Sequence, residues 1–349
     1  MRVMIADVRI LLTGASGFIG SELAPTLLAE GHEVRALARD PGRAQLGLAA
    51  AHAAAGGPFA RKSGAGKGAG TETGGAAEIE IVSGDVLTGA GLAHAMRGVE
   101  VAYYLIHSME RRTGRGPDGR ERDAFPERER TAAEHFAAHA RRAGLERIVY
   151  LGGPLPRTGP ASRHLASRAE VEEILRAHVP TSVALRASIV IGARSRSFRL
   201  LVRIVERLPV LALPAWRRFR TQPIDVRDTV QMLAAAARLP TAAGRTLDLG
   251  GPEAVTYEQL LLRIADLLLL PRPAVGVGVT MTPLTARLAA VLTGEDPELV
   301  LPLMEGLEGD LLPADDHTAE LLGVRLHKLD DAIEHALGAW EAVEPLAAR

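Results

Sequence analysis

The chain contains no cysteine among its 349 residues. Disulfide bonds and thiolate metal sites are therefore excluded, and the composition fits the reducing cytoplasm in which we expect the protein. Aromatic residues make up only 3% of the chain, and the formal net charge is −1. So few aromatic side chains and no excess of positive charge argue against a nucleic-acid partner. No group of histidines and carboxylates has the spacing of a metal site, so we predict none.

Long hydrophobic runs are also missing. A membrane-spanning helix needs about 18 or more consecutive apolar residues, and the leucine run at 267–270 ends at Pro271. The first residues include Asp7 and no long apolar core, so we expect no secretory signal and no integral membrane segment. With 349 residues, of which 47% are hydrophobic, the chain is long enough for a large domain and a smaller second one.

The most informative stretch is residues 8–20, VRILLTGASGFIG. Its apolar residues predict a buried parallel strand that leads through three glycines into a helix. Gly14 permits a sharp turn, Gly17 lets the backbone approach a diphosphate, and Gly20 lets the helix pack close to the sheet. The diphosphate would bind the free N–H groups at the positive end of the helix. The predicted cofactor contacts in this turn also include Ser16, Phe18 and Ile19.

The segment 13–20, TGASGFIG, resembles the TGxxGxxG cofactor motif of extended and atypical short-chain dehydrogenases/reductases. Residues 102–109, AYYLIHSM, resemble one atypical branch, predicted sugar-epimerase-like proteins that bind NAD(P)H. The resemblance implies an α/β Rossmann fold with a doubly wound parallel sheet. We expect this domain over residues 1–192. A smaller, mostly helical substrate domain would follow over 193–349, with 221–252 returning to the core.

The end of the second predicted strand, residues 32–38, indicates which cofactor binds. In a dinucleotide-binding fold an acidic side chain at this point binds the ribose 2′-hydroxyl of NAD. This chain has Ala38 and then Arg39 instead. A guanidinium suits a 2′-phosphate, so we predict NADP(H) in preference to NAD(H). The alternative is an exposed Arg39 paired with Asp40.

Further cofactor contacts are implied by the resemblance where later strands end. A Gly-Asp pair follows the third strand, 78–82, and its carboxylate would lie near the adenine. A turn after the sixth strand, 182–186, resembles the family's LRxSxxxG segment, whose backbone approaches the nicotinamide. The contacts implied are Asp85 and Val86, Leu105 and His107 after the fourth strand (99–106), Gly152 after the fifth (147–151), and Ala187 and Ile189.

The family's catalytic residues are missing. The usual reductase has a serine or threonine after the fifth strand and a Tyr-x-x-x-Lys pair on the next helix, but here the first position falls on Gly152 or Gly153. The Tyr and Lys positions hold His164 and Arg168. Imidazole could donate a proton near neutral pH, and guanidinium could bind ribose hydroxyls or a developing oxyanion. Tyr104, His107 and Tyr150 are the reserve proton donors.

Helical periodicity places His164 on the same stripe as Val171 and Leu175, which should face the sheet. Histidine and arginine on an inward face would be explained by contact with the cofactor, since unpaired buried charge is costly. The alternative is a ladder of His164, Arg168 and Glu172 at a solvated edge.

Other segments carry weaker signals. Residues 48–77, mostly alanine and glycine, predict a flexible surface insertion, and 110–129 an exposed connection before a helix over 130–143. Residues 283–292 and 296–307 predict apolar helices over a ligand pocket. Asp225 and Asp228, in a segment that resembles the PxxVxD of extended members, are predicted to be structural.

Residues 194–220 contain eight arginines and one acid, Glu206. This excess could select an anionic substrate or contact an anionic lipid surface, since an apolar stripe runs beside it. A solvated face of an amphipathic helix is the alternative. The arginines are Arg194, Arg196, Arg199, Arg203, Arg207, Arg217, Arg218 and Arg220.

Three functions remain open. The first is an NADPH-dependent oxidoreductase that moves hydride to a carbonyl or activated double bond of a small molecule. The second is a protein that binds NADP(H) without turnover, as a redox sensor or structural partner, as do relatives such as negative regulators of the NmrA type. The third is sugar-nucleotide epimerase or dehydratase chemistry, although those enzymes also use the missing tyrosine.

Overall fold

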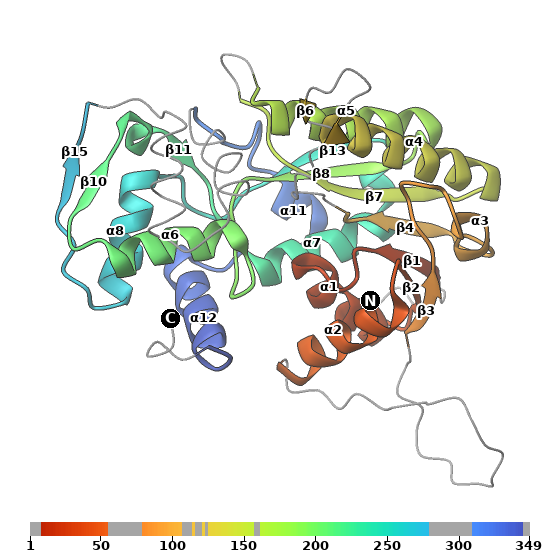
Figure 1. Ribbon diagram of the computed structural model, residues 1–349, viewed down its shortest axis with the longest axis horizontal. Helices are drawn as coiled ribbons and strands as arrows, with labels where there is room; N and C mark the ends of the chain where they lie inside the picture. Colours follow the sequence, from red (N-terminus) through yellow and green to blue (C-terminus); the bar gives the residue numbers. More distant parts are fainter. Residues whose placement is uncertain are drawn as a thin grey trace, which may run out of the picture.

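The computed structural model describes residues 8–54, 79–106, 114–115, 121–122, 125–156, 161–278 and 309–344. Its centre is a seven-stranded sheet with the order β13-β8-β7-β4-β1-β2-β3 (Figure 1), and every pair is parallel. This order reverses between β1 and β4, as in the predicted doubly wound fold. The strands are β1 (Arg9–Thr13), β2 (Glu33–Ala38), β3 (Glu80–Ser83), β4 (Val101–Tyr104), β7 (Arg147–Gly152), β8 (Val183–Ala187) and β13 (Thr246–Leu249).

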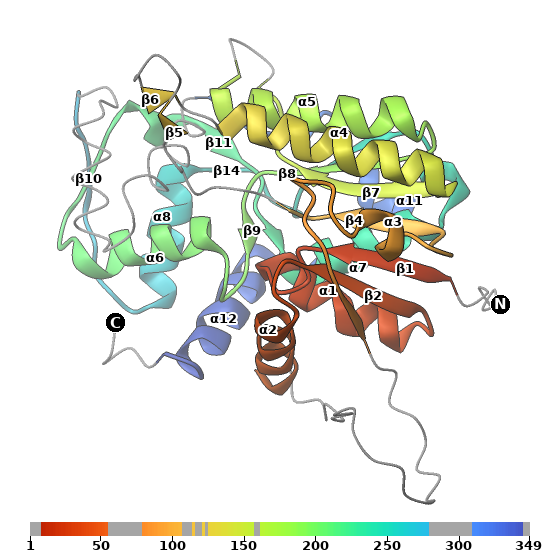
Figure 2. The same cartoon turned by 45° about the vertical axis from the view of Figure 1, so that its right-hand side comes forward.

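Helices cover both faces of this sheet, as Figure 2 shows. The side chains of β1 divide between the two cores, with Ile10 and Leu12 in one and Leu11 in the other, each at most 1% exposed. A strand buried on both faces reads as the continuous apolar run seen in the sequence. One face is covered by α1 (Phe18–Ala29), α2 (Pro41–Ala54), α7 (Val226–Arg238) and α11 (Thr318–Leu322), and the other by α3 (Leu92–Ala95), α4 (Phe125–Ala143) and α5 (Arg163–His178).

The insertion predicted over residues 48–77 was wrong at its start. α2 continues to Ala54, and Leu48 is 3% exposed in the core beside α1. Alanine and leucine favour helix, and Ala44 and Leu48, four residues apart, lie on the same helix face. Because both side chains are buried, this alanine-rich segment has a core to pack on. Residues 55–78 lie outside the described part of the chain.

The exposed connection predicted over 110–129 was also wrong at its end. α4 begins at Phe125, and Glu129 is only 4% exposed. The buried stripe of Ala132 and Phe136 includes Glu129 one turn earlier, so the helix begins before its predicted start at 130. Within the predicted connection, the structure describes two short strands that pair with each other, β5 (Gly114–Arg115) and β6 (Glu121–Arg122).

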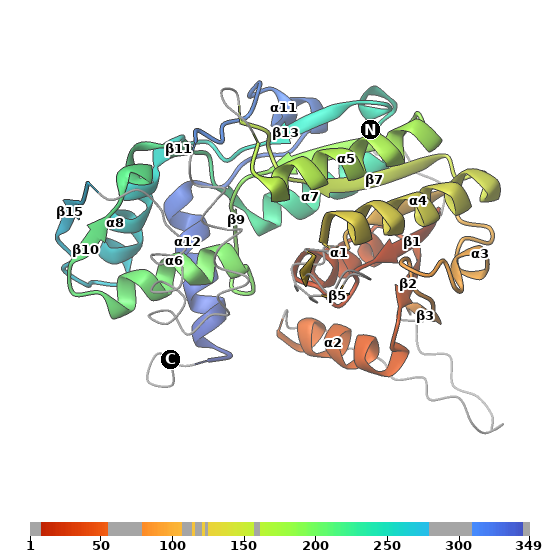
Figure 3. The same ribbon diagram turned by 45° about the horizontal axis from the view of Figure 1, so that its top comes forward.

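The chain beyond β8 builds a second, mostly helical core at one end of the sheet (Figure 3). Phe198, Trp216 and Tyr257 are among its buried side chains. Thr256 and Gln259 form a capping box at the start of α8. The elements of this lobe are β9 (Val190–Ile191), α6 (Arg196–Arg207), β10 (Leu211–Leu213), η1 (Ala215–Arg218), β11 (Arg220–Thr221), β14 (Val255–Thr256), α8 (Tyr257–Leu267), β15 (Ala274–Gly276) and α12 (Leu329–Glu341).

The chain returns from this lobe to the sheet. β12 (Ile224–Asp225) pairs with β9, α7 packs against α1, and β13 joins the sheet beside β8 after the short helix η2 (Pro240–Ala242). These elements, within residues 221–252, therefore contact the core, while the domain boundary at 192 stays a prediction. The helices predicted over 283–292 and 296–307 lie outside the described residues. Within the described ranges, no helix has the length and apolar character needed to cross a bilayer.

Candidate cofactor-binding site

The turn between β1 and α1 has the geometry of an anion site. Gly14 has φ +67°, and a Cβ there would lie 2.8 Å from the backbone oxygen of Leu105, so only glycine fits. The N–H of Gly17 donates to the Gly14 oxygen at 2.9 Å. Gly17 is the N-cap of α1, with no side-chain cap and no acidic residue in the first helical turn. The N–H groups of that turn point out of the helix end, where an anion can accept from them.

Gly20 serves the turn rather than the sheet. A Cβ at Gly20 would lie 2.2 Å from the Gly14 oxygen and 2.8 Å from the Cα of Ala15. The first turn of α1 therefore packs on the loop that leads into it. The close approach predicted at this glycine is therefore present, but its partner is the turn and not the sheet.

Thr13 ties this turn to the neighbouring strand. Its hydroxyl donates to the Tyr103 oxygen at 2.8 Å and accepts from the N–H of Leu105 at 3.1 Å. The threonine thus fixes the carboxyl ends of β1 and β4 against each other, at the point where the strand order reverses. This role of Thr13 depends on Tyr103 and Leu105, about 90 residues away in the sequence, so the motif alone does not indicate it.

Arg39 follows β2 at the same edge of the sheet, because Thr13 pairs with Leu37 in the parallel register. Its side chain is exposed. The alternative pairing with Asp40 is not favoured, since the Asp40 carboxylate accepts the N–H of Arg43 at 3.1 Å and so caps α2. Arg39 therefore lies at the end of β2, while the carboxylate of its neighbour Asp40 caps α2.

The adenine side of the predicted site lies after β3. Asp85 accepts the N–H of Leu87 at 2.9 Å, and its own N–H donates to the Ala90 oxygen at 2.9 Å. Val86 is 7% exposed and belongs to the core. The Asp85 carboxylate stabilises its own turn through one oxygen.

Arg168 reaches the carboxyl end of β7. Its guanidinium donates to the Leu151 oxygen and lies 5.7 Å from the centroid of the Tyr150 ring. The Tyr150 hydroxyl donates to the Arg168 oxygen at 3.1 Å. Gly152 is buried, and a Cβ there would lie 3.0 Å from the Tyr150 ring. The arginine, the tyrosine and the glycine thus come together where the sheet ends.

His164 lies one helical turn before Arg168, half-buried, with its ring stacked on Phe125 at 5.9 Å between centroids. Val171 and Leu175 face the core as the helical stripe predicts. The alternative ladder through Glu172 is wrong, because Glu172 is 4% exposed and accepts from Arg186 and Thr246. The Glu172 carboxylate thus binds side chains of β8 and β13.

The reserve proton donors Tyr104 and Tyr150 are both buried. Tyr104 is 1% exposed and packs edge-on against Phe136. Burial raises the pKa of both tyrosines, that of Tyr150 to about 12. Neither hydroxyl is prepared to ionise near neutral pH. His107 lies outside the described residues.

The nicotinamide end of the predicted site lies after β8, where Ala187 and Ile189 are 8% and 6% exposed. The next segment packs directly on α1. A Cβ at Gly192 would lie 2.6 Å from the Phe18 ring, so this glycine makes room for a side chain of the glycine-rich turn. Ile19, like Phe18, is half-buried.

Four of the eight arginines in segment 194–220 pair with carboxylates, which offsets part of the charge excess counted in the sequence. Its acidic partners come from elsewhere in the chain. Arg199 bonds Glu344 at 2.6 Å and lies 4.3 Å from the Trp340 ring centroid, while Arg217 bonds Glu258 and Arg220 bonds Asp310. These pairs hold the second lobe together and leave less positive charge for a lipid surface than the sequence suggests.

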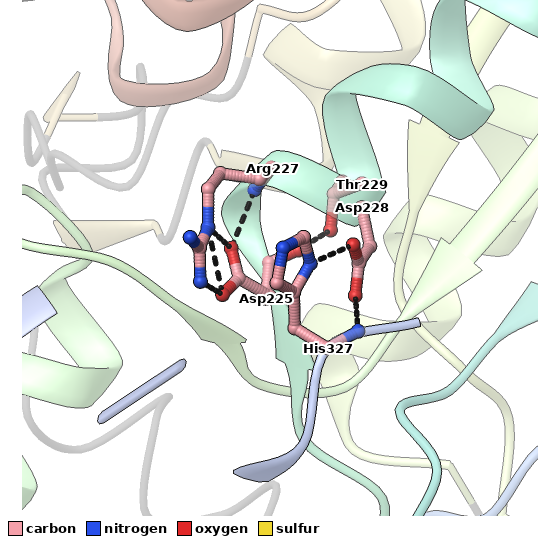
Figure 4. Close-up of polar contacts among 5 residues, drawn as sticks. All are labelled: Asp225, Arg227, Asp228, Thr229 and His327. Carbon is pink, nitrogen blue, oxygen red and sulfur yellow. Dashed lines mark hydrogen bonds and ion pairs between the residues drawn. The ribbon is translucent and has the colours of Figure 1, made fainter. Parts of the chain in front are cut away.

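Asp225 and Asp228 are structural, as predicted (Figure 4). Asp225 caps α7 by accepting the N–H of Arg227 at 2.7 Å and pairs with its guanidinium at 2.6 Å. Asp228 accepts both the N–H and the ring Nδ1 of His327. Asp225 thus stabilises the start of α7, and Asp228 attaches that start to the C-terminal segment.

The doubly wound sheet, the glycine-rich turn and the helical second lobe define a Rossmann protein of the short-chain dehydrogenase/reductase type. The model of the NmrA-like family matches residues 6–241, and the chain belongs to this family. This confirms the resemblance found in the sequence.

Three relatives illustrate the match. A ceramide reductase from Caulobacter vibrioides (strain NA1000 / CB15N) is 28% identical over 240 residues, which cover 68% of this chain and 64% of the relative. The crystal structure of gox2253 is 20% identical, with a TM-score of 0.67 over 97% of this chain and 98% of that one. A UDP-glucuronic acid 4-epimerase from Bacillus cereus, in complex with UDP-glucuronic acid and NAD, is 16% identical, with a TM-score of 0.65 over 96% and 100%.

Proposed function

We propose that this protein is an NADP(H)-dependent oxidoreductase that transfers a hydride to a carbonyl group or an activated double bond of an apolar or anionic small molecule. The observation that carries the proposal is the uncapped start of α1 beside the end of β2. The first would hold the cofactor diphosphate. The second offers Arg39, with no acidic side chain at Ala38, to a 2′-phosphate.

The other cofactor contacts would come from the carboxyl ends of the neighbouring strands. Asp85 and Val86 would face the adenine, and the backbone at Leu105, His107 and Gly152 would line the middle of the cofactor. Ala187 and Ile189 would approach the nicotinamide. Strand order supports this assignment, since β3, β2, β1, β4, β7 and β8 are successive neighbours and present their carboxyl ends along one edge.

For the chemistry we assign the proton to His164 and the ribose or the developing oxyanion to Arg168. Both lie on α5, and Arg168 touches the end of β7 through the Leu151 oxygen. NADPH, when bound, supplies the hydride. An imidazole that is protonated near neutral pH can then give its proton to the oxygen of the carbonyl group whose carbon receives the hydride. The relative named ceramide reductase supports a reductase with an apolar substrate.

A second candidate is binding of NADP(H) without turnover. Two observations favour binding without turnover. The Tyr-Lys pair is absent from the sequence, and burial raises the pKa of the Tyr150 hydroxyl, so this tyrosine is a poor proton donor. The epimerases and dehydratases among the structural neighbours support the third candidate, sugar-nucleotide chemistry, at the level of the fold.

Fluorescence titration with NADPH and NADH tests the cofactor assignment. We expect NADPH to bind at least tenfold more tightly than NADH, and Arg39→Ala to remove that difference. Arg142→Ala, an exposed arginine in the last turn of α4, is the charge-matched control and should change neither affinity. Equal affinities in the wild-type protein would count against the 2′-phosphate argument.

Turnover is then measured with NADPH and a panel of ketones, quinones and enones. Oxidation of NADPH that depends on one of these compounds supports the reductase. Tight NADPH binding with no turnover on any of them favours the non-catalytic candidate.

A further inference from the structure

Arg194, from the loop between β9 and α6, reaches across to the glycine-rich turn. Its Nη1 donates to the Ser21 hydroxyl at 2.6 Å, and its Nη2 donates to the Ser16 backbone oxygen at 3.1 Å. Ser16 precedes the N-cap of α1, and Ser21 lies in the first turn of that helix. The guanidinium therefore lies beside the N–H groups assigned above to the cofactor diphosphate.

The electrostatics of this position favour an anion. The start of a helix carries positive potential, so a cation held there is repelled by the helix dipole. Both oxygens that accept from Arg194 are uncharged. The carboxylate that acts on it, Glu22, is partly buried; burial raises its pKa, and Arg194 lowers that pKa in part. A guanidinium in this place would gain from a doubly charged group.

Arg194 keeps N–H donors with which it can bind a ligand. The guanidinium has five N–H donors, of which these two bonds use one at each terminal nitrogen. The side chain is exposed. Its loop is held on α1 by the contact of Gly192 with the Phe18 ring. Arg194 is therefore positioned before any ligand arrives, which reduces the entropy lost on binding.

We infer that Arg194 is a second-lobe contact of the cofactor diphosphate, adding a charged donor to the backbone N–H groups of the glycine-rich turn. The inference rests on the proposed function, because it needs a dinucleotide at this turn. Beyond the proposed function, it gives the second lobe a part in cofactor binding. The same bonds to Ser16 and Ser21 make the arginine a direct link between the lobe and the turn.

Calorimetric titration of Arg194→Ala tests this inference with three ligands. NADPH and ADP-ribose contain the diphosphate, whereas adenosine 2′-monophosphate does not. We expect the dissociation constants of the first two to rise at least tenfold and that of the third to change less than twofold. Arg194→Lys keeps the charge without the planar fork and should recover part of the loss. Arg196→Ala, an exposed arginine two residues away, is the charge-matched control and should bind all three as the wild type does.

Unchanged NADPH affinity in Arg194→Ala would overturn the inference. So would an equal loss for adenosine 2′-monophosphate, since that would mean a distorted turn. Failure of the wild-type protein to bind NADPH would contradict the proposed function instead. In that event inorganic diphosphate is the probe: binding by the wild type that Arg194→Ala loses supports the anion contact alone, and no binding overturns it as well.

Discussion

The carboxylate of Asp228 holds two groups of one distant residue, the backbone N–H of His327 at 2.8 Å and its ring Nδ1 at 2.5 Å. Asp228 is completely buried at the start of α7, and His327 lies two residues before α12, next to its N-cap Lys328 (Figure 4). Ninety-nine residues separate the two in the sequence. A single carboxylate therefore fixes the C-terminal segment to the helix that lines the sheet.

Replacement of Asp228 should cost more stability than replacement of its partner. Asp228→Ala leaves the N–H and the ring of His327 unpaired, and we expect the free energy of unfolding to fall by about 3 kcal/mol. His327→Ala keeps the backbone bond and should cost about 1 kcal/mol. Urea unfolding measures both. Asp316→Ala, whose side chain is 84% exposed, should stay within about 0.5 kcal/mol of wild type.

Gly20→Ala should damage the cofactor turn. The new methyl group would lie 2.2 Å from the Gly14 oxygen, and backbone on both sides leaves little room to shift. We expect a loss of about 3 kcal/mol in stability and loss of NADPH binding. Gly338→Ala, in α12 with open space around its Cβ position, should instead stabilise the protein by about 0.5–1 kcal/mol. A Gly20→Ala protein with native affinity for NADPH would contradict the assigned turn.

The pH dependence of turnover identifies the proton donor. If His164 donates the proton, kcat/KM for carbonyl reduction falls as the pH rises through the range in which imidazole titrates, and His164→Gln removes this limb. Tyr150 cannot produce such a limb, because burial raises its pKa to about 12. Tyr150→Phe should therefore keep the profile. A profile that survives in His164→Gln and disappears in Tyr150→Phe would reverse the assignment.

We expect the free energy of unfolding to depend on pH through Glu22 and its neighbour Arg194. Burial raises the pKa of the Glu22 carboxyl, and Arg194 lowers it in part. The folded protein thus holds a proton that the unfolded chain releases, so stability falls as the pH rises from about 4.5 through the folded pKa. In Arg194→Ala the fall should be larger and extend to higher pH, by less than about 1 kcal/mol because the pair is partly exposed. Glu22→Gln should remove it in both backgrounds.

The sequence predicted the sheet and the glycine-rich turn well because their signals are local. Leu11 and its neighbours encode a strand buried on both faces, and Gly14, Gly17 and Gly20 encode the turn that follows. The charge distribution of the second lobe was harder to predict. The partners of Arg199 and Arg220 are Glu344 and Asp310, which are far away in sequence, so a local count showed an excess where the fold forms pairs.

The contact of Arg194 with the turn was missed for the same reason. Ser16 lies 178 residues before it, and nothing in either segment alone indicates the other. Composition also misled at α2, where the alanine-rich segment up to Ala54 resembles a linker but includes Leu48, which the core buries. Periodicity identified the buried positions of α5, yet which groups pair with Glu172 and Arg168 depends on the neighbouring strands.

The return of the chain to the sheet bears on how the protein can be divided. β13, the strand next to β8, and α7, which packs on α1, both follow α6 in the sequence. A fragment that stops at residue 192 would lack both and expose β8 as an unpaired edge prone to self-association. Recombinant truncation or domain exchange at that position should therefore yield aggregates, whereas the two lobes expressed as one uninterrupted polypeptide should denature in a single cooperative step.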